Sequence, residues 1–388
     1  MDILMYIIKL TVYILLVTIS GYVLVDSLIR NAVSEQRQSW ANRMLQQGAK
    51  ALLLAVIVAL FVQLVSWTQQ FKPEASQLVT LLMEGTTGKV WLALIICSAL
   101  LMLLVTRSAI ARLLLVLAML FAESMNGHAS GDSIRVLFDF IHLATVSIWI
   151  GGAICLWLNW REGKEQAIHF IQRFSKLLWL SIAVVSISGV ILTLLIMPSI
   201  SYLLYTSWGQ MLLLKLAAVL LALWLGYKAK TTLQKHNGAK LKPLAAELIV
   251  LAFVIAFAAL VSSLSPVPSA ANALNHHEMG EELHYTVKLT PNAPGPNRLS
   301  LSLWTLEEEG KVEQVQLSIY AADKPKTSER QFILEPAELE DYFEFPGFIE
   351  TRYKFDKLNL PYPADWEATF TITFENGTER QISFQFEN

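Results

Sequence analysis

Long apolar stretches separated by short polar ones make up the first 265 residues of the chain. About 20 apolar helical residues cross a bilayer core that is about 30 Å thick, and eight stretches come near this length. They are roughly residues 3–25, 51–67, 90–105, 109–122, 136–158, 177–197, 209–227 and 244–263. Because hydrocarbon offers no partner to free backbone amides, we expect each stretch to be a membrane-spanning α-helix. The fourth stretch is short and contains Arg112.

The pattern changes after Ser265-Pro266. Short runs of alternating apolar and polar residues then occur at roughly residues 283–289, 298–304, 312–320, 330–334, 349–355, 366–374 and 380–386. A period of two is typical of half-buried β-strands, and Asn376-Gly377 between the last two runs is a hairpin signal. Seven short strands separated by turn residues predict an immunoglobulin-like sandwich.

The expected fold is therefore an all-α polytopic membrane bundle followed by a C-terminal, extracellular, all-β immunoglobulin-like sandwich. We expect the helical domain at residues 1–265, a linker at 266–280 and the β domain at 281–388. Composition agrees, because 54% of the residues are hydrophobic and only 16% are charged, whereas soluble domains are about a quarter charged. An ordinary soluble protein is excluded.

Charge indicates the orientation in the membrane. Residues 1–265 carry 20 Lys and Arg against 11 Asp and Glu, whereas residues 266–388 carry 10 against 21. Loops on one side of the eight expected spans hold fifteen Lys and Arg, and loops on the other side hold only Lys72, Lys89 and Arg135. Since basic residues accumulate in cytoplasmic loops, the richer side is expected in the cytoplasm. An even number of spans then places both termini, with the acidic tail, outside the plasma membrane.

The first apolar stretch is expected to be a retained span. Only Met1 and Asp2 precede it, and a cleavable signal peptide begins with a basic segment. Cys97 and Cys155 both fall in apolar stretches, so no structural disulfide is expected. The sequence has no Walker A motif, which argues against ATP-driven pumping by this chain.

Ionisable side chains inside a membrane span are costly and are candidates for function. The densest group lies near the expected outer face and comprises Glu123, Met125, His128, Asp132, Asp139 and His142. Asp139 and His142 are three residues apart, so they share a helix face on which a carboxylate can orient an imidazole or join it as a metal ligand. The alternatives are a purely structural Asp139–His142 pair and a solvated loop for the other four residues.

Three further features have structural interpretations as strong as functional ones. Lys9 and Lys215 lie near the outer ends of their spans and can extend to the lipid headgroups; a role for Lys215 in repelling or gating a cation is the alternative. Gly151-Gly152 favours close helix packing. Cys155 is expected to be a small apolar packing residue.

A second group of donor side chains follows the last span. The expected metal donors are His276, His277, Met279 and His284, and Glu278 lies among them. Copper accepts both imidazole and thioether ligands, so the group is predicted to collect metal outside the membrane. A solvated run that binds no metal is the alternative.

Several segments, in order, resemble the CopD family of copper-resistance and copper-uptake membrane proteins. They are Asn126-Gly127-His128-Ala129, Asp139-Phe140-Ile141-His142-Leu143, Ile148-Trp149-Ile150-Gly151-Gly152, Arg173-Phe174-Ser175, Ser188-Gly189, Trp208-Gly209, Leu214-Lys215 and Glu247 before Ser265-Pro266. The CopD-like core is expected at about residues 120–265. The tail, with Gly295-Pro296-Asn297, resembles the extracellular C-terminal domain of YcnJ-like members.

The resemblance implies that the chain moves copper ions across the plasma membrane, in uptake or resistance. His128, His142, Asp139 and Met125 are then expected to receive the ion. Relatives often begin with a copper-binding CopC-like domain, whereas this sequence begins with a span. We therefore expect a separate extracellular copper donor protein, or the tail, to deliver the ion. The remaining partner is the lipid bilayer, and neither nucleic-acid binding nor enzymatic activity is expected.

Two other classes of protein stay open. A membrane-anchored copper sensor or assembly factor would use the acidic tail to bind a metal or a partner, with the helices as an anchor. A b-type haem redox protein needs two axial imidazoles on facing helices. Only His142 lies clearly within an expected span, which argues against haem.

Overall fold

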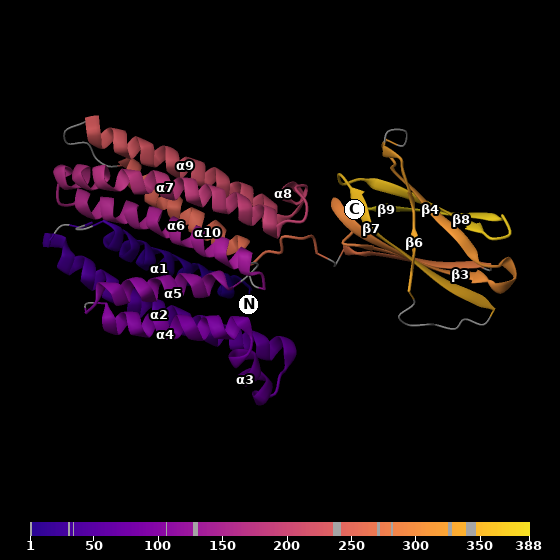
Figure 1. The fold of residues 1–388 in the computed structure, drawn as a ribbon, viewed down its shortest axis with the longest axis horizontal. Coiled ribbons are helices and arrows are strands. Elements are labelled where there is room, and N and C mark those ends of the chain that lie inside the picture. The colour runs from indigo at the N-terminus through magenta and orange to yellow at the C-terminus, as the bar shows by residue number, and fades with distance from the viewer. Residues whose placement is uncertain are drawn as a thin grey trace. The chain divides into compact units, whose positions relative to one another are not determined.

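The computed structural model describes the chain except residues 1, 30, 31, 34, 106, 127–130, 236–241, 270, 271, 281, 325–327 and 339–346. The chain forms two compact units, coloured from indigo to yellow along the sequence in Figure 1. The first, helical unit comprises Met1–Ile196 and Met211–Leu264, and the second, β unit comprises Met197–Gln210 and Ser265–Asn388.

Long helices account for the eight predicted apolar stretches. They are α1 (Asp2–Leu28), α2 (Glu35–Phe71), α4 (Thr86–Leu104), α5 (Ala109–Ser124), α6 (Ser133–Trp160), α7 (Lys164–Ile196), α9 (Ser207–Lys235) and α10 (Lys242–Val261). Helix α2 begins well before its apolar stretch, because residues such as Gln and Ala continue a helix without being apolar enough to signal a span. Helix α3 (Ala75–Met83), between α2 and α4, was not predicted.

Seven of these helices are long and apolar enough to cross a membrane within the described residues. They are α1, α2, α4, α6, α7, α9 and α10. Helix α5 has 16 residues and is not among them. The count of eight spans therefore stays a prediction, and so does the side of the membrane on which the termini lie.

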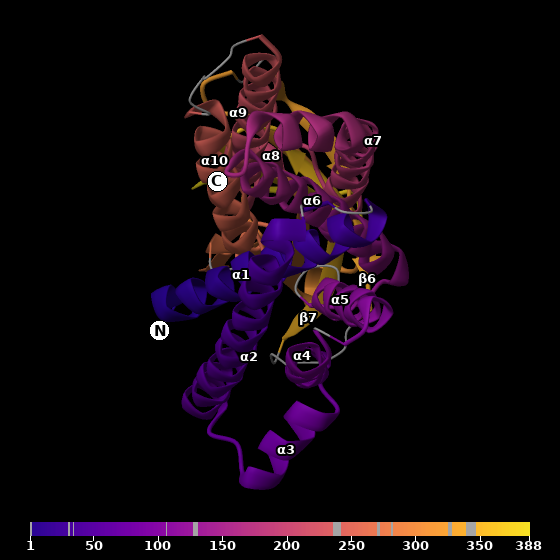
Figure 2. The ribbon, with the colours of Figure 1, turned by 90° about the vertical axis from the view of Figure 1, so that its left-hand side faces the viewer.

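Helix α6 packs against α1 on one side and α7 on the other, and α5 contacts both α1 and α6 (Figure 2). The contact between α1 and α6 is made through backbone. A Cβ added at Gly151 would lie 2.1 Å from the Gly21 carbonyl oxygen, and one at Gly21 would lie 2.2 Å from the Ser147 carbonyl oxygen. Gly152 makes room for the Phe174 ring of α7 in the same way. The predicted close packing at the glycine pair is confirmed.

The β unit holds two antiparallel sheets. The first has the order β1 (Leu274–Met279), β2 (Leu283–Thr290), β3 (Gly295–Leu306), β7 (Phe348–Leu360), β6 (Glu335–Ala337). The second has the order β5 (Arg330–Ile333), β4 (Val312–Ala321), β8 (Asp365–Phe374), β9 (Glu379–Glu387). Inward residues of both sheets form one hydrophobic core that includes Leu301, Leu317 and Phe370. A helix of one turn, α8 (Tyr202–Tyr205), also belongs to this unit.

Two strands differ from the prediction. Residues Leu274–Met279, which we placed in the linker at 266–280, form β1 and pair with β2. Strand β6 is three residues long and contains Pro336, a residue tolerated at a sheet edge. Neither segment has the apolar alternation of a half-buried strand, so pairing with a neighbour determines its conformation. The immunoglobulin-like topology stays a prediction.

One buried side chain organises the turn between β2 and β3. The Oδ1 atom of Asn297 accepts from the backbone N–H groups of Asn292 (2.9 Å) and Ala293 (3.2 Å). Its Nδ2 donates to the carbonyl oxygens of Ala293 and Gly295, both at 2.8 Å. Asn297 is 2% exposed, so these four hydrogen bonds satisfy a buried amide and hold the turn.

Candidate functional site

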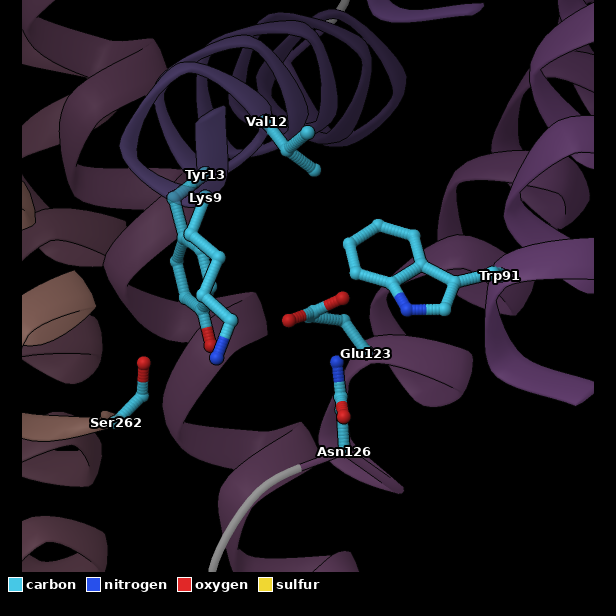
Figure 3. Close-up of a pocket in the computed structure, with 7 residues that line it drawn as sticks. All are labelled: Lys9, Val12, Tyr13, Trp91, Glu123, Asn126 and Ser262. Carbon is cyan, nitrogen blue, oxygen red and sulfur yellow. The ribbon is translucent and has the colours of Figure 1, made fainter. Parts of the chain in front are cut away.

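A small cavity lies inside the helical unit, lined by side chains from α1, α4 and α5 and by two residues that lie just after α5 and α10. Its volume is about 20 Å³, which accommodates about one water molecule or ion. The lining residues are Lys9, Val12, Tyr13, Trp91, Glu123, Asn126 and Ser262 (Figure 3). Lys9 and Tyr13 are four residues apart on α1, so helical geometry directs both toward the same cavity.

Glu123 is the principal charged group of this cavity. Its side chain belongs to the last turn of α5 and is 3% exposed, which rules out the solvated-loop alternative for this residue. Tyr13 and Asn126 are its hydrogen-bonding neighbours, and Lys9 attracts it electrostatically. Its Oε2 atom is nevertheless buried without a hydrogen-bond partner. A carboxylate oxygen left unpaired in a dry site is costly and marks a candidate site.

His142 is held by the neighbouring helix. Its Nδ1 atom lies 3.0 Å from the Ser188 hydroxyl of α7. A Cβ at Gly189 would come within 3.2 Å of the imidazole Cε1, so the adjacent glycine leaves room for the ring. Because Ser188 engages Nδ1, the Nε2 nitrogen of the half-buried ring is the one available to a metal ion. Second-shell hydrogen bonds of this kind fix the orientation of a ligating imidazole.

Asp139 lies one helical turn before His142 but interacts with a different residue. The Asp139 carboxylate and Lys215 of α9 attract each other electrostatically. Asp139 also repels Glu123 at the cavity. Within the described residues, no hydrogen bond or ion pair joins Asp139 to His142. The structure therefore does not support the alternative in which these two residues pair only with each other. Lys215 is half-buried in the structure.

A third buried acidic group lies on α10. Glu247 is 6% exposed and accepts a hydrogen bond from the Trp149 indole N–H of α6 at 3.4 Å. Its Oε1 atom would lie only 2.8 Å from a Cβ at Gly226 of α9, so the glycine provides the space for the carboxylate. Sequence reasoning used Glu247 and Trp149 only as motif matches and did not predict that they contact each other.

The other predicted residues of the outer-face group have different environments. Met125 is 38% exposed and caps the C-terminus of α5. Asp132 is the N-cap of α6, where its Oδ1 accepts from the Ile134 N–H at 2.8 Å, so it has a structural role. His128 lies outside the described residues. Among the residues that the structure describes, no three His, Cys, Asp or Glu side chains are arranged to hold a metal ion.

The second predicted group is divided between the two faces of a sheet. In the β1–β2 register, His277 lies opposite Thr286 and Met279 lies opposite His284. His277, Met279 and His284 therefore share one face, and His276 lies on the other. The His276 ring stacks on Phe384 with ring centroids 4.8 Å apart. The structure thus brings three of the four predicted donors to one face and separates the fourth.

An open cleft of about 490 Å³ lies at the edge of the β unit, and its charged groups are paired within the chain. Arg380 bonds to Glu282 at 2.7 Å and also to Glu309. The Tyr285 hydroxyl donates to Glu278. Burial, together with the Glu278 carboxylate, raises the pKa of Tyr285. Each of these charged side chains has a partner within the chain, although the Nε atom of Arg380 and the Oε2 atom of Glu309 are themselves buried without a hydrogen bond.

Sequence reasoning missed Tyr13, Trp91 and Ser262 as members of the cavity. Tyr13 carried a usable signal, because it is a polar side chain one turn after Lys9 in an apolar stretch. Trp91 and Ser262 carried none, since both residue types are common at membrane interfaces and in helix packing.

Comparison with known proteins agrees with the sequence resemblance. Residues 168–264 match the family model described as "Copper resistance protein D", CopD. The chain is 28% identical over 323 residues to the "Copper transport protein CutJ" of Bacillus subtilis (strain 168). The alignment covers 74% of this chain, which spans 58% of that relative's length. These two matches support the resemblance to the CopD family, and the seven candidate spans agree with a multi-pass membrane protein.

One solved structure also matches, the Pseudomonas fluorescens alkylpurine DNA glycosylase AlkC bound to DNA containing an abasic site analog. Its sequence identity is 12% and its TM-score is 0.19, over 79% of this chain and 93% of that chain. A TM-score this low carries no argument about fold or function.

Proposed function

We propose that the helical unit transports copper across the plasma membrane and that it is not an enzyme. The ion is received at the outer face by His142 and Asp139, with Met125 and His128 completing the group. The matching family is named for copper resistance and the Bacillus subtilis relative for copper transport, which supports copper as the substrate.

The observation that carries the proposal is the placement of His142. Its imidazole is inside a span-length helix, is oriented through Nδ1 by Ser188, and lies one turn from a carboxylate. An oriented imidazole beside a carboxylate is a transition-metal donor set. On neighbouring helices, the half-buried Lys215 and the buried Glu247 supply further polar groups, and ionisable groups within a span typically line ion pathways.

Copper accumulation in cells tests the proposal. Cells that express the full chain, the His142→Ala variant and the His169→Ala variant are compared with cells that lack the chain. His169 is an exposed histidine of α7 and serves as the matched control. We expect the chain and His169→Ala to change cellular copper equally, and His142→Ala to match cells without the chain. Unchanged accumulation with His142→Ala contradicts the proposal.

The β unit has a supporting role in this proposal. With both termini outside, it lies where extracellular copper arrives, and a separate donor protein hands copper to it or directly to the helices. Deletion of residues 270–388 distinguishes transport by the helical unit from the alternative of a sensor or assembly factor. Retained copper transport favours the helical transporter, whereas complete loss of transport with normal membrane insertion favours a sensor or assembly factor that acts through the tail.

A haem alternative is tested by the absorbance spectrum of the purified chain, in which a Soret band would indicate haem.

A further inference from the structure

We propose that the cavity at Glu123 is a binding site for one small monovalent metal cation of the alkali class, such as Na⁺, which exchanges with the ammonium group of Lys9. The proposal goes beyond copper transport and concerns a different ion and different residues.

The donor atoms around the cavity are oxygens. Glu123 contributes a carboxylate, and Tyr13 and Ser262 contribute two hydroxyls, while Asn126 turns its amide nitrogen toward Glu123 (Figure 3). Hard cations take oxygen ligands, whereas copper in its soft, monovalent state takes sulfur and imidazole. The cavity of about 20 Å³ has room for about one ion. Chemistry and size therefore both select a small hard cation.

The unpartnered Glu123 oxygen indicates that something is bound there in another state. Glu123 is 3% exposed, its Oε2 atom has no hydrogen-bond partner, and it lines the cavity. A buried polar atom without a partner is costly, and a cation in the cavity removes the cost at this oxygen. The Trp91 indole N–H is also buried without a partner at this cavity, and a water molecule that accompanies the ion can accept from it.

Lys9 provides the charge that the cation replaces. Its ammonium group attracts Glu123, yet within the described residues no ion pair of 4.0 Å or less joins them. Lys9 is only half-buried and lies two turns from the start of α1. Its flexible stem allows the ammonium group to withdraw toward the surface.

The charge balance around the cavity favours this exchange. The charged groups that face Glu123 are Lys9 from α1 and Asp139 from α6, and Asp139 is itself balanced by Lys215 from α9. Tyr13 is the other titratable group of the lining, which also includes Trp91 of α4 and Ser262, the residue after α10. Two carboxylates and two lysines are neutral together. When Lys9 leaves and a monovalent cation enters, neutrality is kept, whereas a divalent ion leaves an excess positive charge in a dry site.

Radioactive ²²Na⁺ binding to the purified full chain in detergent tests the proposal. The variants are Glu123→Gln, which removes the charge, Lys9→Met, which removes the competing ammonium, and Tyr13→Phe, which removes one oxygen. Glu84→Gln, at an exposed carboxylate, is the matched control. We expect saturable binding to the wild type and to Glu84→Gln, and background binding to Glu123→Gln. We expect about tenfold tighter binding to Lys9→Met and several-fold weaker binding to Tyr13→Phe.

Three outcomes overturn the proposal. They are Glu123→Gln binding that equals the wild type, Lys9→Met binding no tighter than the wild type, and background binding to both the wild type and Lys9→Met, which means that the cavity holds water alone. If Glu123→Gln aggregates during size-exclusion chromatography, Lys9→Met and Tyr13→Phe decide the question. Copper accumulation is a separate measurement: a chain that accumulates copper but binds no ²²Na⁺ overturns this proposal and leaves copper transport in place.

Discussion

The indole N–H of Trp149 on α6 donates to the carboxylate of Glu247 on α10 across 3.4 Å, with both residues almost completely buried. This contact joins two helices that are far apart in the sequence. A carboxylate in such a position needs a donor, because the surrounding side chains are apolar.

Trp149→Phe is expected to destabilise the helical unit. The substitution leaves the Glu247 oxygen buried without this donor, which costs about 1–3 kcal/mol. Thermal unfolding of the detergent-solubilised chain measures the effect. Trp179→Phe, at a tryptophan that is 64% exposed on α7, should unfold at the wild-type temperature. Equal unfolding temperatures for both variants would show that the hydrogen bond contributes nothing to stability.

Ser188→Ala is expected to lower the affinity for copper, although the Ser188 hydroxyl does not itself bind the ion. The hydroxyl orients the His142 imidazole at 3.0 Å, and loss of a second-shell partner lowers metal affinity by about 10- to 100-fold. The readout is the copper concentration that gives half-maximal accumulation in cells. Ser186→Ala is the control, since the Ser186 hydroxyl bonds only to the backbone of its own helix at Ile182. An identical half-maximal concentration in both variants contradicts the orienting role.

Gly151→Ala is expected to prevent correct packing of α1 against α6. Its Cβ would lie 2.1 Å from the backbone oxygen of Gly21, which, unlike a side chain, cannot relieve the clash by changing rotamer. We expect little or no monodisperse protein in size-exclusion chromatography. Gly48→Ala tests whether any helical glycine would do the same, because its Cβ would meet only the Ile19 side chain at 3.3 Å. Normal recovery of Gly151→Ala would contradict the close backbone contact.

Asn297→Ala is expected to destabilise the β unit selectively. The change removes four hydrogen bonds to the β2–β3 turn and leaves buried backbone groups unpaired, at a cost of about 1–3 kcal/mol. Limited proteolysis of the full chain should cut the β unit faster than in the wild type. Asn275→Ala, at an exposed position of β1, should change stability by less than about 0.5 kcal/mol. Equal cleavage rates in the two variants would refute the expectation.

Much of the fold was predictable because its signals are local. A stretch such as residues 136–158 is apolar for long enough to require a helix, and it lies within α6. Strands with clear alternation, such as β8, were also predictable. Strand β1 was not, because Asn275, His276 and His277 have weak strand propensity and are held by pairing with β2.

The site was only partly predictable because its contacts join distant segments. The spacing of Asp139 and His142 placed both on α6, yet their partners Lys215 and Ser188 lie on other helices and gave no sequence signal of contact. Glu123 was flagged by its charge, but its burial follows from the packing of α1 and α4 around it. Periodicity determines which face a residue occupies and does not determine what lies opposite.

The crossing of α1 and α6 at Gly21 and Gly151 has a mechanical consequence. Since the two backbones touch there, neither helix can slide past the other at that point, and relative movement is confined to tilting about it as a fulcrum. Lys9 and Tyr13 on α1 precede the fulcrum by about the same number of residues as Asp139 and His142 on α6. A tilt of about 10° there displaces residues 15 Å away by roughly 2.6 Å, given about 1.5 Å of rise per residue. A tilt of α1 against α6 therefore changes the distance between the Lys9 and Tyr13 side chains of the cavity and the His142 imidazole.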